Sequence, residues 1–432
     1  MNLSVNRGFQ DDEVFRMNAA SPRQIIAYLA PEIPALSATF VYEEMLGLAR
    51  RGVTVIPVSV HRPHQPAENQ AELASRVRYL YQGSRAKQLL AGLIRLPFQS
   101  GAWKALGWLR ADIVECGPLR PASWKLAYQF LVAVRLAELL KQEQCTHLHV
   151  HFAHVPTQIA MYAAALSGVP FTIMAHANDI FERGLLLRRK AERAVKMLTI
   201  SAHNIAYLKS VGVPAEKLAI VRCGVSFAAR PTLPVAARRE IYRIGSLGRL
   251  VEKKGMDVLI RALAALRDKP YRIELSIAGD GPLRGELERL VEESGLTGTV
   301  QFVGSLAHHQ VREWMHGLDA FVLACKQDAN GDMDGIPVVL MEAMSQSVPV
   351  ISTRLSGIPE LVVDAKTGLL AEPGNPADLA ARIDQLLGST ELRDALSAAA
   401  RTHVEREFGQ PANLDRLIGH MGLATRALAT RQ

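Results

Sequence analysis

The sequence predicts an α/β protein built from two doubly wound parallel sheets. Short apolar segments alternate with segments of helical periodicity along most of the 432 residues. This rhythm is typical of parallel strands joined by right-handed helical crossovers. A chain of this length also exceeds what one hydrophobic core usually supports. A stretch rich in proline and small residues, 226–240, interrupts the alternation, and we interpret it as a linker between two domains.

The other boundaries follow from the same alternation. Residues 1–21 contain acidic residues and no apolar run, so we expect a flexible N-terminus without a signal peptide and a cytoplasmic protein. The first predicted domain spans residues 22–225 and the second spans 241–408. A final helical segment occupies 409–432.

The elements of the first domain are read from its apolar runs. Ile25–Leu29 is predicted as a short buried strand, Thr39–Arg50 as a helix and Gly52–Val58 as the next strand. A helix at 156–167 and a strand at 171–174 continue the pattern. Parallel strands end at a common edge, where the ligands of such sheets collect. Polar residues that directly follow a strand are therefore the first candidates for a binding site.

Residues 85–125 depart from this rhythm. They contain seven Lys or Arg against two acidic residues, with Trp103, Trp108 and Trp124 among the cations. This composition suits a pair of helices at an anionic membrane surface, with the rings at headgroup level. An amphipathic insertion packed on its own domain explains the same composition. No nucleic-acid motif accompanies the charge, so nucleic acid is not an expected partner.

Charge, cysteines and missing motifs restrict the function classes. The net charge of +8 suits an anionic ligand or an anionic surface. The four cysteines are far apart, so we expect reduced core residues rather than a zinc site or a disulfide framework. The sequence contains no Gly-x-Gly-x-x-Gly and no Gly-Lys-Ser/Thr phosphate loop. Both absences argue against dinucleotide oxidoreductases and P-loop ATPases.

Histidines mark the strand ends of the first domain. His147, His149 and His151 alternate along a predicted strand, which places two of them on one face, as a metal site requires. No nearby Cys, Asp or Glu completes such a site, so hydrogen-bonded histidines are the preferred interpretation and no metal is predicted. His176 follows the strand at 171–174 and is a candidate for binding a sugar hydroxyl in a cleft. A structural role for His176 is the alternative.

Two cations follow the first strand of the second domain. Arg249 and Lys254 are five residues apart in a predicted strand-to-helix loop, so both can converge on one point at the carboxyl edge of the sheet. Arginine binds phosphate through its bidentate fork and lysine acts as a point charge. The pair therefore suits a diphosphate, and solvated surface charge is the alternative for either residue.

The stretch 334–342 carries the strongest indication of a ligand. Gly335 to Pro337 permits a turn followed by a helix that begins at the proline. The N–H groups of Val338 and Val339 would then lie at a helix N-terminus, which binds phosphate readily. Asp334 and Glu342 flank that position, as a nucleotide sugar would require. A buried strand-to-helix crossover with a capping Asp and a solvent-facing Glu is the alternative.

Four ordered motifs resemble glycosyltransferase family 4. They are Gly248–Gly255, Ala278–Leu283, Asp334–Met344 and Ser356–Glu360. Pro34–Val41 and the phrase around His176 resemble the subgroup that builds bacterial exopolysaccharide on a lipid carrier. The resemblance implies the GT-B fold, in which two doubly wound Rossmann-like domains face each other across a cleft and a final helix, here 409–432, crosses back to the first domain. It also implies a retaining transferase that uses a UDP- or GDP-sugar donor and requires no metal or other cofactor.

The resemblance further implies roles for individual residues. Arg249 and Lys254 would bind the diphosphate, Glu342 the ribose, and Asp334 would face the transferred sugar. His176 would lie across the cleft near the sugar and the acceptor, which the subgroup suggests is a polyprenyl-linked saccharide. The turn that would offer its N–H groups to the donor comprises Gly335, Ile336, Pro337, Val338 and Val339.

Two departures from the family pattern leave alternatives open. The family has Glu where this chain has Asp334, and a Gly-Gly loop where it has Pro31–Pro34. The shorter acid motivates a second hypothesis, a non-catalytic nucleotide-sugar-binding subunit. A third is a nucleotide-sugar epimerase of the same fold, which would need neither a lipid acceptor nor the basic segment 85–125. We expect a cytoplasmic enzyme, which attaches peripherally to the inner face of the cell membrane if that segment binds lipid rather than packing on its own domain.

Overall fold

The computed structural model describes residues 24–34, 39–63, 75–225 and 241–423. The predicted N-terminus at 1–21 and linker at 226–240 lie outside the described residues. So do positions 35–38 of the Pro34–Val41 motif and the end of the chain beyond residue 423.

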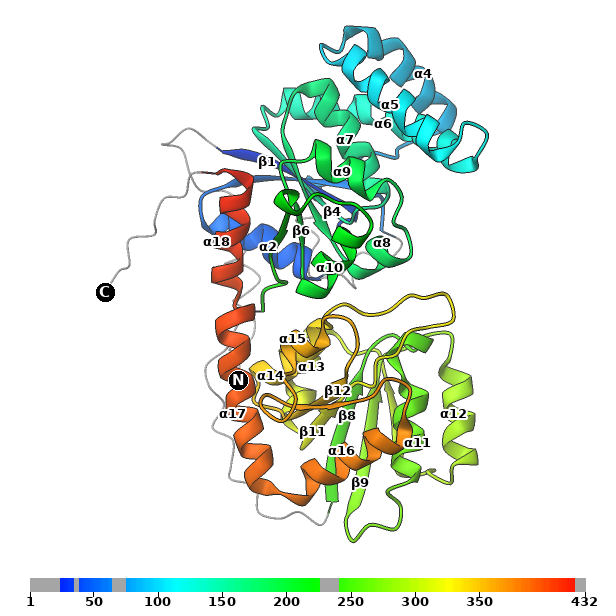
Figure 1. Cartoon of the computed structure of the whole chain (residues 1–432), viewed down its shortest axis with the longest axis vertical. Helices are drawn as coiled ribbons and strands as arrows, with labels where there is room; N and C mark the ends of the chain where they lie inside the picture. The colour runs from blue at the N-terminus through cyan, green and yellow to red at the C-terminus, as the bar shows by residue number, and fades with distance from the viewer. Residues whose placement is uncertain (1–23, 35–38, 64–74, 226–240, 424–432) are drawn as a thin grey trace, which may run out of the picture. The chain divides into compact units, whose positions relative to one another are not determined.

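The described chain forms two compact units, each built on one parallel sheet (Figure 1). The first unit contains the described residues up to Thr199, residues 205–224 and the chain from Gln410 onward. The second contains residues 200–204 and the described part of 225–409. The predicted α/β class with two doubly wound sheets is thereby confirmed.

The first sheet has seven strands in the order β3-β2-β1-β4-β5-β6-β7. Every neighbouring pair is parallel. The chain starts at the centre, winds to one edge and returns to the other side of β1, which makes the sheet doubly wound. The strands are β1 (Ile25–Glu32), β2 (Thr54–His61), β3 (Arg78–Tyr79), β4 (His147–His151), β5 (Phe171–Ala175), β6 (Met197–Thr199) and β7 (Leu218–Ile220).

The second sheet has six parallel strands in the order β10-β9-β8-β11-β12-β13 and is wound in the same way. Its first strand, β8, again lies inside the sheet, so the chain reverses its winding direction after β10. The strands are β8 (Ile241–Leu247), β9 (Arg272–Ala278), β10 (Val300–Gly304), β11 (Ala320–Val322), β12 (Val350–Thr353) and β13 (Leu369–Ala371).

Helices join the strands of both units. In the first unit they are α2 (Thr39–Arg50), α4 (Arg85–Arg95), α5 (Ala102–Cys116), α6 (Pro121–Gln142), α7 (Val155–Ser167), α8 (Ala177–Phe181), α9 (Leu187–Arg193), α10 (Ala202–Ser210, whose first residues belong to the second unit) and α18 (Gln410–Met421). In the second unit they are α11 (Met256–Ala264), α12 (Arg284–Glu293), α13 (His308–His316), α14 (Val338–Ser345), α15 (Ile358–Leu361), α16 (Pro376–Gly388) and α17 (Thr390–Phe408).

The core of the first unit lies between its sheet and helices α6 and α7. Strands β4 and β5 are buried along their whole length, as expected for central parallel strands covered on both faces. Phe130 of α6 packs edge-on against Tyr162 of α7, with ring centroids 5.4 Å apart. The four cysteines are free and buried, which confirms their prediction as reduced core residues: Cys116, Cys145, Cys223 and Cys325.

Helix α18 packs against α2 within the first unit. Leu414 lies so close to Gly47 that a Cβ at that glycine would come within 2.3 Å of the Leu414 side chain. Arg51 of α2's C-terminal turn forms an ion pair with Asp415 at 3.1 Å. The Asn413 side chain accepts a hydrogen bond from the backbone of Arg222 at 3.1 Å. The end of the chain thus completes the unit that its beginning starts.

The basic segment 85–125 forms α4, α5 and the start of α6. Its inner side is packed: Asp112 is buried and bound by Arg193, whose guanidinium lies 4.6 Å from the Trp108 ring. Its outer side exposes large apolar groups, with Trp103 87% exposed and Trp124 70% exposed. No helix in the described part of the chain is long and apolar enough to cross a membrane. Among the described residues, the segment therefore has one packed face and one face that exposes large apolar side chains.

Candidate active site

Glycines bring the loop after β8 close to its neighbours. Gly255 follows the short 3-10 helix Glu252–Lys254 and has φ +64°. A Cβ at Gly255 would come within 1.8 Å of the Ala324 carbonyl oxygen, so a side chain does not fit there. At Gly248, a Cβ would lie 3.3 Å from the stem of Lys254. These positions fix Lys254 beside the end of β11.

Lys254 forms a close ion pair with Asp334. The Lys254 Nζ lies 2.7 Å from Asp334 Oδ2, and the two side chains are only 16% and 14% exposed. Lys253 Nζ lies 3.8 Å from the other oxygen of Asp334 and 2.7 Å from Asp332. The Cys325 thiol donates to Asp334 Oδ2 at 3.3 Å. Asp334 is thus held by two lysines and one thiol.

The ion pair keeps both partners charged. Burial alone would raise the pKa of Asp334, but the Lys254 ammonium and its hydrogen bond outweigh burial and hold this pKa below its usual value. Burial alone would lower the pKa of Lys254, but the Asp334 carboxylate outweighs it and raises this pKa. Burial, with the adjacent carboxylate, raises the pKa of the Cys325 thiol. Near neutral pH the site therefore offers a cation next to an anion.

Helix α14 begins one residue later than the sequence predicts. Pro337 is the N-cap, with φ −65° and ψ 124°, and Val338 is the first helical residue. The extended ψ of Pro337 explains the difference, because a cap residue lies outside the helical region while its carbonyl already accepts from Leu340 at 3.1 Å. Val338 and Val339 still belong to the first turn, whose N–H groups have no partner within a helix. Glu342 lies one turn further along α14 and is partly buried.

The structure brings together some of the predicted residues and adds others. Lys254, Asp334 and the start of α14 lie at the carboxyl edge of the second sheet, whereas Arg249 is exposed and lies outside the ion-paired cluster. Sequence reasoning missed Lys253 and Cys325. Cys325 follows a buried apolar strand, the same position that drew attention to His176. The Asp328 carboxylate accepts hydrogen bonds from the backbone N–H groups of residues 330 and 332, and so stabilises the loop that contains it.

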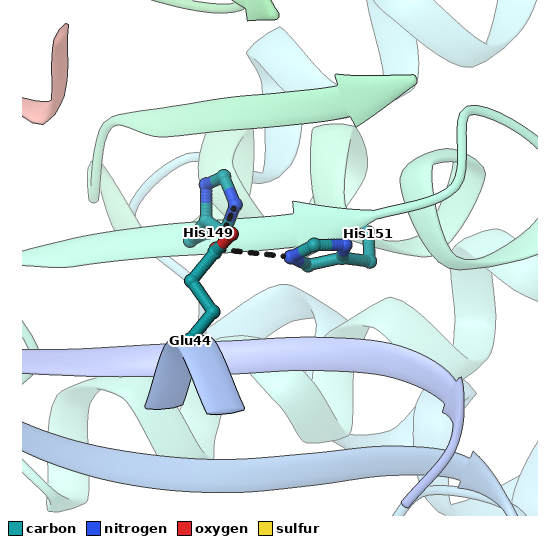
Figure 2. Close-up of side chains that lie close together, drawn as sticks. All are labelled: Glu44, His149 and His151. Atoms are coloured by element: carbon teal, nitrogen blue, oxygen red, sulfur yellow. Dashed lines mark hydrogen bonds and ion pairs between the residues drawn. The ribbon is translucent and has the colours of Figure 1, made fainter. Parts of the chain in front are cut away.

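The histidines of β4 differ from the prediction in two respects. Side chains two residues apart share a face of a strand, so all three of His147, His149 and His151 point the same way, not two of them. His147 and His149 contact the Thr172 hydroxyl at 3.0 and 2.7 Å. The expectation that no acid completes the group was wrong, because Glu44 of α2 lies against His149 and His151 (Figure 2).

His176 lies directly after β5 and next to this group. Its Nε2 is 3.3 Å from His151 Nδ1, and its ring lies 4.7 Å from that of Phe152 and 5.1 Å from that of Phe40, centroid to centroid. Burial lowers the pKa of His176 to about 3, so the imidazole is neutral at pH 7. A neutral imidazole can donate or accept a hydrogen bond, but it brings no positive charge.

Comparisons with known proteins agree across the chain. The family model "Glycosyltransferase Family 4" matches residues 37–228, and "Glycosyl transferases group 1" matches residues 236–403. The putative colanic acid biosynthesis glycosyltransferase WcaL of Salmonella typhimurium is 30% identical over 404 residues, which cover 90% of this chain and 97% of the relative. The amylovoran biosynthesis glycosyltransferase AmsK of Erwinia amylovora is 29% identical over 89% of this chain and 96% of its own.

The fold has a counterpart among solved structures. Anabaena Alr3699/HepE, crystallised in complex with UDP, superposes with a TM-score of 0.68 at 16% identity and covers 92% of this chain and 99% of its own. An identity this low supports the fold alone. Together with the family models and the relatives, it shows that this chain is a glycosyltransferase of the GT-B fold and belongs to glycosyltransferase family 4.

Proposed function

We propose that this glycosyltransferase moves a hexosyl group, with retention of configuration, from a UDP- or GDP-sugar to a polyprenyl-linked saccharide in exopolysaccharide biosynthesis. The names of WcaL and AmsK, which refer to colanic acid and amylovoran, support the pathway class. The UDP bound to Anabaena Alr3699/HepE supports a nucleotide-sugar donor. The observation that carries the proposal is the Lys254–Asp334 pair beside the start of α14.

In the proposed complex, the diphosphate binds Lys254, Arg249 and the first-turn N–H groups of α14. Lys254 suits this role because its raised pKa keeps it cationic, and charge-assisted hydrogen bonds to phosphate are strong. Asp334 then faces the hydroxyls of the transferred sugar, and Glu342 binds the ribose. The donor-binding residues on the turn are Gly335, Ile336, Pro337, Val338 and Val339.

The proposed chemistry needs no protein nucleophile. The bond between the anomeric carbon and the phosphate oxygen breaks, and the negative charge that develops on the departing diphosphate is stabilised by Lys254 and Arg249. The acceptor hydroxyl attacks the same face of the sugar and gives its proton to an oxygen of the leaving phosphate. His176, neutral at pH 7, is proposed to position the sugar or the acceptor by hydrogen bonding.

We further propose that α4, α5 and the start of α6 rest on an anionic membrane at its cytoplasmic face. Exposed Trp103, Phe98 and Trp124 supply apolar groups for the headgroup region, and the surrounding lysines and arginines supply charge. A lipid-linked acceptor would be presented at such a surface. The packed inner side of the segment, with Asp112 and Trp108, leaves this outer side available.

One assay tests donor, acceptor and surface together. The purified protein is given UDP- and GDP-hexoses, and nucleotide release is measured with a lipid-linked saccharide in anionic or zwitterionic vesicles. We expect acceptor-dependent release from one donor, faster on anionic vesicles. Lys254→Ala should lower kcat/KM by about 100-fold or more, because it removes a cation aimed at the leaving group. Lys269→Ala is the matched control, since Lys269 pairs with Asp384 at 2.6 Å on an exposed surface.

The alternatives give different outcomes in the same assay. Donor binding without release under any acceptor would favour a non-catalytic binding subunit. An isomerised nucleotide sugar without a glycoside product would identify an epimerase. Equal rates on both kinds of vesicle would contradict the membrane part of the proposal and leave the transferase intact.

A further inference from the structure

We propose that Glu44, His149 and His151 form a binding site for one divalent transition-metal ion, with zinc as the best fit. The three side chains come from α2 and β4 of the first unit and point toward one another in Figure 2. The site belongs to the first unit, whereas the Lys254–Asp334 cluster belongs to the second, and its test does not depend on transferase activity.

The donor atoms have the spacing of a metal site. One donor atom from each residue lies within 4.8 Å of the other two. Glu44 Oε1 is 3.2 Å from His151 Nε2 and 3.6 Å from His149 Nε2. Tetrahedral bonds of 2.0 to 2.2 Å place neighbouring ligands about 3.4 Å apart. The two carboxylate-to-nitrogen distances match this spacing to within a few tenths of an ångström, and the two imidazole donors lie within 4.8 Å of each other.

One ring nitrogen of His149 is available to bind a metal ion. Its Nδ1 lies 2.7 Å from the Thr172 hydroxyl, which fixes the ring. Its Nε2 is fully buried and has no hydrogen-bond partner, although it faces Glu44. A buried polar atom without a hydrogen-bond partner is unfavourable. A metal ion would occupy that atom, and the contact between Thr172 and the ring corresponds to the outer-shell hydrogen bond that metal-binding histidines usually make.

The charge of the cluster also calls for a cation. The Glu44 side chain is only 11% exposed. Its ion-pair partners among the described residues are imidazoles, and no described Lys or Arg pairs with it. An ionised carboxylate at this depth without a lysine or arginine partner would be unfavourable, and a divalent ion would compensate its charge.

The donor types favour zinc over magnesium or calcium. Two imidazole nitrogens and one carboxylate are typical zinc ligands, whereas magnesium and calcium prefer oxygen. The Tyr28 hydroxyl, 2.6 Å from His151 Nε2 and hydrogen-bonded to Glu44, borders the donor set and would give up its contact with Nε2 to the ion, with a water as the fourth ligand. With a metal on Nε2, His151 must carry its proton on Nδ1, which faces His176 Nε2 at 3.3 Å. The ion would thereby fix the orientation of His176 as well as join α2 to β4.

Metal binding by the full chain tests the inference. Protein stripped with a chelator is titrated with Zn²⁺ by calorimetry, and Co²⁺ is added separately to record its visible absorption. We expect one ion per chain, a higher Tm with Zn²⁺, and Co²⁺ bands typical of a four-coordinate site. Glu44→Gln and His149→Gln should each weaken Zn²⁺ binding by more than about 100-fold, and Thr172→Val by about 10-fold or more. Mg²⁺ should not bind there.

His147→Gln is the matched control. His147 lies on the same strand and the same face and also contacts Thr172, but it lies outside the donor set. This variant should bind Zn²⁺ like the parent protein, and circular dichroism checks that every variant is folded. The proposal is wrong if the folded parent protein binds no Zn²⁺, or if binding is equally tight in the parent, Glu44→Gln and His149→Gln. In that case the cluster is a hydrogen-bonded network around Glu44.

Discussion

The two units each bury a carboxylate near the carboxyl end of a central strand, but they surround it differently. Asp334 lies between Lys254 and Lys253, and the ammonium groups hold its pKa low despite burial. Glu44 lies among Tyr28 and imidazoles, and burial there raises its pKa. Similar groups at similar depth therefore have pKa values shifted in opposite directions because their partners differ. In the second unit, lysines neutralise the buried carboxylate. In the first unit, we propose that a bound metal ion does so.

The largest expected effect comes from removing the cation of the second unit. Lys254→Met leaves Asp334 buried with only the more distant Lys253, so unfolding by urea should cost about 3 kcal/mol less. Lys269→Met, which breaks an exposed pair, should change stability by less than about 1 kcal/mol. Adding Asp334→Asn to Lys254→Met should restore part of the loss. Equal losses for Lys254→Met and Lys269→Met would remove the basis of the comparison.

A smaller effect is expected at the carboxylate of the first unit. With a chelator present, Glu44→Gln should change the free energy of unfolding by less than about 1 kcal/mol, or stabilise the protein. The amide keeps the size of the side chain and an acceptor for Tyr28, while no buried charge remains. Urea unfolding in EDTA measures it. A loss as large as that of Lys254→Met would mean that Glu44 is stabilised by a partner comparable to a lysine.

The smallest expected effect is the response of the Lys254–Asp334 pair to pH. The folded pKa of Asp334 is lowered, so its contribution to stability is present above its unfolded value near 3.8 and is lost as the pH falls through the folded pKa. The folded pKa of Lys254 is raised, so its contribution is present below about 10.5 and is lost as the pH rises through the folded pKa. A double-mutant cycle of Lys254 and Asp334 should give the same coupling energy at pH 5, 7 and 9. A drop above about 0.5 kcal/mol within that range would show that one partner titrates there.

The fold was predictable because it depends on local periodicity. Apolar runs and helical spacing place the strands, and the helix at Thr39–Arg50 has the predicted bounds. Lys254 and Asp334 were found because each stands beside a recognisable turn. The contact between Glu44 and His151 was not predicted. It joins residues 107 positions apart, and no local sequence pattern indicates which helix covers which strand. The start of α14 was predicted one residue too early, because proline is compatible with both the N-cap and the first helical position.

The packing of α18 on α2 has a consequence for the synthesis of the protein. The ribosome makes the part of the first unit that precedes residue 225 early, but Gln410–Met421 emerge only after the whole second unit. Until then the face of α2 that receives Leu414 at Gly47 stays open to solvent, and Arg51 lacks Asp415. The second unit, by contrast, is made almost entirely from one continuous run of chain. The second unit therefore has all of its residues before the first unit does. A truncation that removes α18 consequently damages the first unit, most of which is translated earlier.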